Sequence, residues 1–188
     1  MTSLYKRTAT HVCSLVFLAA ASAVWAVPAE DQLISQLGSG DSSKVVAAFQ
    51  SLEKNYPLST NVVPFIKKMV GDSREAVKRK AAREAGIYHV DLSADELKQV
   101  CSLLTDSNWR AVEDGLKALR DLKKPDAAAS VVPCLKNPND HVMRDACRTL
   151  AVIGDKSVVP SIQPLLSNPN PAVHKDAQDA IDALNAKP

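Results

Sequence analysis

The stretch that decides the fold is Leu135-Lys136-Asn137-Pro138-Asn139-Asp140-His141-Val142, because the chain repeats its pattern 31 residues later as Leu166-Ser167-Asn168-Pro169-Asn170-Pro171-Ala172-Val173. The same shift pairs Asp145 with Asp176, and a shift of 31 residues in the other direction pairs Asp145 with Asp114. A fixed period of this length is typical of repeat proteins, in which each unit is one small supersecondary element.

Comparison over a longer distance extends the repeat toward the N-terminus. A shift of 96 residues aligns Val62-Val63-Pro64 with Val158-Val159-Pro160, and the segment 31–56 fits the same pattern less closely. The 188-residue chain is therefore divided into five units, which we place at 30–57, 58–90, 93–124, 126–154 and 156–186.

Each unit is expected to form two helices. In the second half of a unit, apolar residues recur at the spacing of one helical face, as in Val77, Ala81, Ala85 and Tyr88 and again in Val142, Ala146, Leu150 and Ile153. Helix starts are predicted by a capping box at Ser93–Glu96 and by N-caps at Asn139, Asn170 and Asp126, and Gly154-Asp155 predicts a stop followed by a new start. No strand alternation is present, so the sequence indicates an all-α protein.

The chain resembles the HEAT-repeat family over nearly all of residues 27–188. In that family the first helix often carries a proline, an Asp or Asn follows eight residues later, and a Val opens the second helix. Pro64, Asp72 and Val77 match this pattern, as do Pro160, Asn168 and Val173. The usual arginine after that valine is absent, and Lys78, Val112, Met143 and His174 stand there instead.

The resemblance implies a right-handed α-solenoid of about five stacked helix pairs, with the second helices on the concave side. Stacking supplies the neighbour that no single pair has for its apolar face. The alternative reading is a generic helical bundle.

The first 26 residues have the three parts of a secretory signal peptide. Lys6 and Arg7 precede an uncharged, largely apolar stretch at 12–24, and Val24-Trp25-Ala26 predicts cleavage after Ala26. The apolar run is shorter than the roughly 20 residues of a spanning helix, so we expect export to the periplasm or beyond with no stable membrane anchor; the alternative is a retained anchor. Cleavage removes two of the 23 basic residues and leaves 21 against 21 acidic ones. A neutral mature chain argues against nucleic-acid binding.

Catalytic and metal-binding motifs are missing from the sequence. It contains no Gly-rich phosphate loop, CxxC, HExxH or GxSxG. Asp114, Asp145 and Asp176 recur one repeat apart, which at roughly 10 Å is too far for one ion. We therefore predict no catalytic residue, no metal and no cofactor. The three cysteines after residue 26 are interpreted as buried apolar residues, and Trp109 either packs at a repeat turn or anchors a partner.

A band of basic residues is the predicted binding site. It occupies the second helices at positions opposite the core stripe: Arg79, Arg83, Lys117, Arg120, Arg144, Arg148 and Lys175. Stacking would align these cations along the concave face, where arginine suits carboxylate and phosphate groups. The alternative is an ordinary solvated helix face.

The sequence thus favours an exported, non-catalytic scaffold that binds a protein or an extended peptide, with an anionic partner favoured by the basic band. Two alternatives stay open: a HEAT-like lyase or other enzyme that uses the concave groove, and a structural spacer in the envelope.

Overall fold

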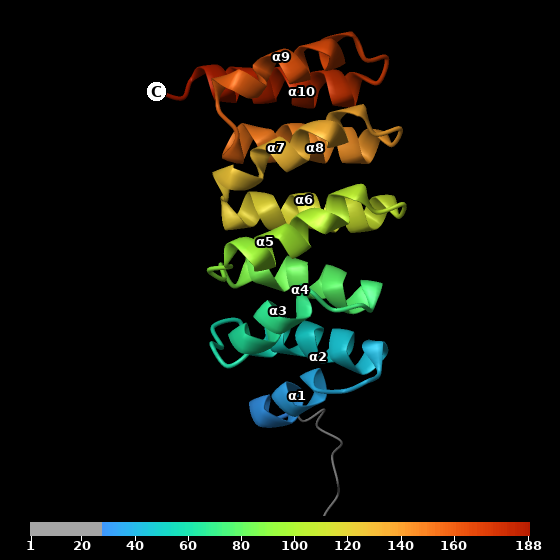
Figure 1. The fold of residues 1–188 in the computed structure, drawn as a ribbon, viewed down its shortest axis with the longest axis vertical. Helices are drawn as coiled ribbons and strands as arrows, with labels where there is room; N and C mark the ends of the chain where they lie inside the picture. Colours follow the sequence, from blue (N-terminus) through green and yellow to red (C-terminus); the bar gives the residue numbers. More distant parts are fainter. Residues whose placement is uncertain (1–27) are drawn as a thin grey trace, which may run out of the picture.

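Helix pairs stacked one on another make up the computed structural model, which describes residues 28–188 (Figure 1). The predicted signal peptide lies outside the described residues. Within residues 28–188 the regular structure is helical throughout, which confirms the all-α prediction.

Five first helices and five second helices alternate along the described chain. The first helices are α1 (Glu30–Leu37), α3 (Val63–Met69), α5 (Ala94–Cys101), α7 (Ala128–Val131) and α9 (Val159–Ile162). The second helices are α2 (Ser42–Asn55), α4 (Glu75–Ile87), α6 (Trp109–Leu122), α8 (Asp140–Ile153) and α10 (Pro171–Asn185). Short 3₁₀ turns extend the later first helices: η1 (Ser102–Thr105), η2 (Pro125–Ala127), η3 (Val132–Lys136), η4 (Lys156–Val158) and η5 (Gln163–Ser167).

Prolines explain why the first helices of the last two repeats are short and broken. Pro133 lies in η3 and Pro164 in η5. Each ring removes a backbone donor and crowds the preceding turn, so the α-helical ladder cannot continue and the chain tightens into 3₁₀ geometry. The second helices carry no interior proline and run for 13 to 15 residues.

The core follows the predicted apolar stripe. Val77, Ala81 and Ala85 are fully buried, and so are their counterparts Val142 and Ala146. Neighbouring second helices pack on one another in chain order, α2 on α4, α4 on α6, α6 on α8 and α8 on α10. The core is therefore a continuous seam between repeats, as expected when no unit can bury its face alone.

Most of the predicted helix boundaries are confirmed. Ser93 and Glu96 form the capping box, and the side chains of Asn139 and Asn170 accept from the backbone N–H groups of His141 and Ala172. Gly154 ends α8, and Asp155 caps the turn that follows.

The N-cap predicted at Asp126 is wrong. Pro125, whose φ is preset for a helical turn, begins η2, so Asp126 already lies inside that turn and its side chain makes no capping hydrogen bond.

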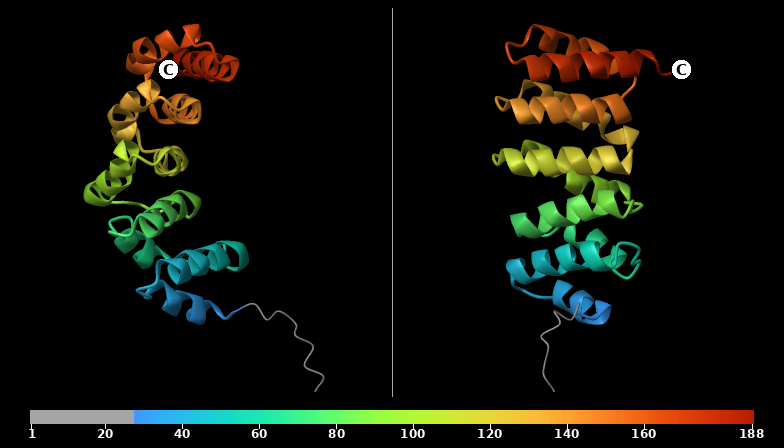
Figure 2. Two further views of the ribbon diagram at one scale, coloured as in Figure 1. Left: turned by 90° about the vertical axis from the view of Figure 1, so that its right-hand side faces the viewer. Right: turned by 180° about the vertical axis from the view of Figure 1, so that it is seen from behind.

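The stack is curved. Figure 2 (left) shows the second helices along the hollow side and the first helices along the outer side. The expected placement of the second helices on the concave face is thus visible directly. Among the described residues, no helix is long and apolar enough to cross a membrane.

Candidate binding surface

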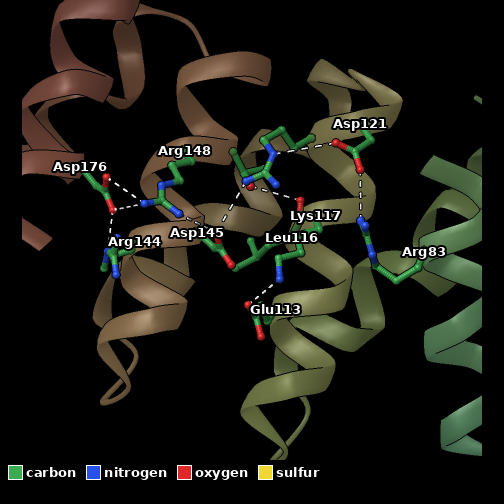
Figure 3. Close-up of polar contacts among 11 residues, drawn as sticks. Arg83, Glu113, Leu116, Lys117, Asp121, Arg144, Asp145, Arg148 and Asp176 are labelled. Atoms are coloured by element: carbon green, nitrogen blue, oxygen red, sulfur yellow. Dashed lines mark hydrogen bonds and ion pairs between the residues drawn. The ribbon is translucent and has the colours of Figure 1, made fainter. Parts of the chain in front are cut away.

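The seven basic residues of the predicted band all lie on α4, α6, α8 and α10, the helices of the concave side. Each has a carboxylate oxygen within 4 Å of a side-chain nitrogen. The band is therefore a set of ion pairs, most of which join one repeat to the next (Figure 3).

Between α4 and α6, two arginines reach forward to aspartates of the following repeat. Arg79 Nη2 lies 2.8 Å from Asp114 Oδ2, and Arg83 Nη1 lies 3.1 Å from Asp121 Oδ2. Arg79 also approaches Glu75, one turn earlier on its own helix, at 3.5 Å.

Between α8 and α10, two arginines share one aspartate. Arg144 Nε lies 2.7 Å from Asp176 Oδ2, and Arg148 Nη2 lies 3.0 Å from the same oxygen. Asp176 is buried, so two guanidinium groups compensate a carboxylate that has lost most of its water. We call the ion pairs that join neighbouring second helices the ion-pair ladder. Asp176 is the point of this ladder where two arginines meet one carboxylate oxygen.

Between α6 and α8, the ladder is looser. Arg120 Nη1 and Arg148 Nη1 each lie 3.6 Å from Asp145 Oδ1. Burial raises the pKa of Asp145, while the charges of Lys117 and Arg120 oppose that rise. Lys117 itself pairs within its helix with Glu113 at 2.6 Å, and Lys175 pairs in the same way with Asp179 at 2.5 Å.

The recurring aspartates at 114, 145 and 176 now have a structural role that the sequence analysis did not assign. Each one forms an ion pair with an arginine of the preceding repeat. In the HEAT-repeat pattern the arginine directly follows the valine that opens the second helix. The arginines of this chain stand at other positions of the second helices. The sequence contains a signal for these pairs. When neighbouring repeats are aligned, a basic residue of the preceding repeat lies near the position that matches each aspartate, but only the stacked structure shows that the two side chains meet.

At the first junction the signs of the ladder are reversed, a feature the sequence analysis missed. Lys80 stands at the register of Asp114, Asp145 and Asp176, and it lies 2.8 Å from Glu53 Oε2 on α2. Lys80 also lies 2.5 Å from Glu84 Oε1, one turn later on α4.

Glu84 is a fully buried carboxylate at a position where the other repeats carry small residues, namely Ala118, Thr149 and Ala180. Burial raises the pKa of Glu84 to about 7, against the opposing effect of Lys80. An alignment of the repeats reveals both exchanges, lysine for aspartate and glutamate for a small residue.

The three cysteines within residues 28–188 are free thiols, and two of them, Cys134 and Cys147, are buried. Burial raises the pKa of Cys134 to about 11 and that of Cys147 to about 12, so both behave as small apolar residues. Within residues 28–188 no group of three His, Cys, Asp or Glu side chains is arranged to hold a metal ion.

Comparison with known proteins identifies the repeat. Residues 62–147 match the family described as HEAT repeats. The fold is a HEAT/armadillo-like α-solenoid. A search of curated proteins found no match.

Several solved structures share the solenoid. One chain of the CpcE–CpcF complex of phycocyanin lyase from Nostoc sp. PCC7120 superposes with a TM-score of 0.71 at 21% identity, covering 86% of this chain and 66% of that one. An engineered protein matches at 0.64 and 18% identity, over 85% of this chain and 80% of its own. A designed armadillo repeat protein matches at 0.60 and 17% identity, over 81% of each chain. At these identities the likeness concerns the HEAT-like fold alone.

Proposed function

We propose that this HEAT-repeat solenoid is an exported, non-catalytic scaffold that binds a protein or an extended peptide along its concave second-helix face. The observation that carries the proposal is the ion-pair ladder. It holds long, flexible side chains in fixed positions before a partner arrives, which lowers the entropy cost of ordering them on binding.

The ladder leaves some charge accessible to a partner. The side chain of Arg148 is 45% exposed and that of Lys175 is 73% exposed, whereas Asp176 beneath them is 10% exposed. Lys175 is paired with Asp179, which is itself 58% exposed, so Arg148 is the cation that faces solvent above a buried acid at this end, and it supports an anionic partner. Affinity for such a partner should fall with added salt, because exposed charges are screened within about 10 Å at 0.1 M.

The test is capture of partners from the native envelope fraction by the immobilised mature chain, compared with the double variant Arg83→Gln/Arg148→Gln. Neutralising two cations of the concave face should weaken capture by about tenfold, at roughly 0.7 kcal/mol for each partly exposed pair. Reversal of charge is avoided, because a carboxylate at 148 would face Asp145 and Asp176.

The matched control is Lys98→Gln/Lys156→Gln, which removes the same number of cations from α5 and η4 on the outer side. It should capture as the wild type does. Equal capture by all three chains, with unchanged melting temperatures, would refute the concave face as the binding site.

An enzyme is the second candidate, favoured by one observation: the fold is shared with a chain of a phycocyanin lyase complex. If this chain acts as a lyase, adding it to phycocyanin should change the visible absorption spectrum. An unchanged spectrum, alongside partner capture, would support the scaffold.

Export is the part of the proposal that rests on the sequence of residues 1–26. We expect the mature chain to begin at Val27, because the small residue Ala26 follows the short apolar run. Intact-mass spectrometry of the protein isolated from its native compartment decides this. A mass that includes Met1 would contradict secretion.

A further inference from the structure

A groove lies away from the middle of the concave face, at the edge of the stack where the second helices begin. The loops that lead into α6, α8 and α10 lie together on this edge, at the right of Figure 1. The groove has a volume of about 760 Å³, within the range of small-ligand sites. Its walls are planar polar side chains and one aromatic pair: Asp106, Trp109, Asn137, Asn139, Asp140 and His141.

A repeated hydrogen bond is broken at this groove. Asn108 caps α6 and donates through Nδ2 to Glu75, the first residue of α4, at 2.7 Å. Asn170 caps α10 and donates in the same way to Asp140, the first residue of α8, at 2.6 Å.

Asn139 caps α8 between them, but the first residue of the preceding second helix is Trp109, which has no acceptor. Within residues 28–188 the Asn139 side-chain amide donates no hydrogen bond, although its Oδ1 accepts the cap bond from His141 N–H at 2.9 Å. The groove lies where this repeated asparagine-to-carboxylate hydrogen bond has no carboxylate to accept it.

Trp109 instead forms an aromatic platform with the next repeat. Its ring stacks on His141 with centroids 5.6 Å apart and planes 21° from parallel, and the Arg110 guanidinium lies 4.5 Å from the Trp109 centroid. His141 is exposed, and both rings of the platform line the groove.

The charges around the groove argue against an ionic ligand. An anion would meet the carboxylates of Asp106 and Asp140, and a cation would meet the guanidinium group of Arg144. The ligand that fits is neutral and carries both hydrogen-bond acceptors and donors. An acceptor would receive the N–H of the Asn139 amide, and a donor would bind a carboxylate oxygen. Hydroxyl groups have both capacities, and the flat C–H face of a sugar ring suits an aromatic platform.

We propose that this groove binds a neutral saccharide, with the Asn139 amide donating to a ring hydroxyl, the Asp106 and Asp140 carboxylates accepting from others, and the Trp109–His141 pair supporting one sugar face. The site is separate from the proposed protein-binding band, apart from Arg144, which borders both.

The test is titration of the chain 27–188 with maltotetraose, cellotetraose and chitotetraose, followed by intrinsic fluorescence. Trp109 is the only tryptophan of that chain, so the signal reports on the groove wall itself. At least one of the three sugars should produce a saturable change. No response to any of them, or a response instead to a short unstructured peptide, would overturn the proposal.

The decisive variant is Asn139→Asp. Aspartate is as good an N-cap as asparagine, so α8 keeps its start, but the free amide donor is lost. Sugar affinity should fall about fivefold to tenfold, as for the loss of one hydrogen bond. Asn185→Asp is the control, because it makes the same change at the last residue of α10, outside the groove, and its affinity should equal that of the wild type. If both variants bind sugar equally well, the Asn139 amide makes no contact and the assignment fails.

Discussion

Glu84 makes the stability of the first junction depend on pH. Burial raises its pKa to about 7 in the folded chain, whereas the unfolded chain titrates near the model-compound value of 4.5. Between these two values the folded chain holds a proton that the unfolded chain has released. The free energy of unfolding should therefore fall as pH rises from about 4.5 to about 7, by at most about 1.4 kcal/mol per pH unit.

The variant Glu84→Gln removes this dependence. Glutamine keeps the size of the side chain and leaves Lys80 paired with Glu53. We expect the variant to be more stable than the wild type at pH 8 and to lose the slope between pH 4.5 and 7. Urea unfolding at a series of pH values measures both, and a wild-type curve that rises across this window would contradict the account.

Thr149 is the second residue with a measurable individual role. It is fully buried on α8, and its hydroxyl donates to the Leu116 carbonyl on α6 at 3.1 Å. Thr149→Val removes the donor with little change of shape, so we expect a loss of about 1 kcal/mol in unfolding free energy. Thr149→Ser, which keeps the hydroxyl, is the control for that bond; equal destabilisation by both variants would mean that packing of the methyl group dominates.

Between helices, the coupling energy of each ion pair in the ladder should increase with the burial of its aspartate. Asp176 is 10% exposed where it meets Arg144, and Asp114 is 24% exposed where it meets Arg79. Low exposure strengthens the attraction and makes an unpaired carboxylate costly. Double-mutant cycles with alanine should give a coupling of about 1–2 kcal/mol for Arg144–Asp176 and below about 1 kcal/mol for Arg79–Asp114. The reverse order would show that these pairs are only surface contacts.

The helices and their apolar faces could be predicted from the sequence, because periodicity and caps are local properties. Asn139, Asn170 and Ser93 act within one turn of their own helices, so their roles follow from neighbours in sequence. The N-cap prediction for Asp126 was wrong because the turn begins one residue earlier, at Pro125.

The pairing of the basic band could not be predicted in the same way. Arg144 and Asp176 are 32 residues apart, and whether they meet depends on the stacking of α8 on α10. The positions of the seven basic residues on the second helices were accessible from the repeat, but their partners required the three-dimensional arrangement. The groove at Asn139 was hidden for the same reason, because its missing hydrogen bond is visible only beside the two intact ones.

For the whole molecule, the stack sets the shape. Five layers at about 10 Å each give a length near 50 Å, and the second helices pack on one another in chain order. Small-angle scattering of the chain 27–188 should show an elongated, curved particle, and circular dichroism should show helix without appreciable sheet. A pair-distance distribution with the symmetric form of a compact sphere would be incompatible with the open stack in Figure 2.

The central claim is that a partner lies along the concave, second-helix side, and cross-linking mass spectrometry of the captured complex tests it most directly. Lysines mark the two sides: Lys117 and Lys175 lie on α6 and α10, while Lys98, Lys136 and Lys156 lie on α5, η3 and η4. We predict that cross-links to the partner concentrate on Lys117 and Lys175. Cross-links that concentrate instead on Lys98, Lys136 and Lys156 would place the partner on the outer side and contradict the account.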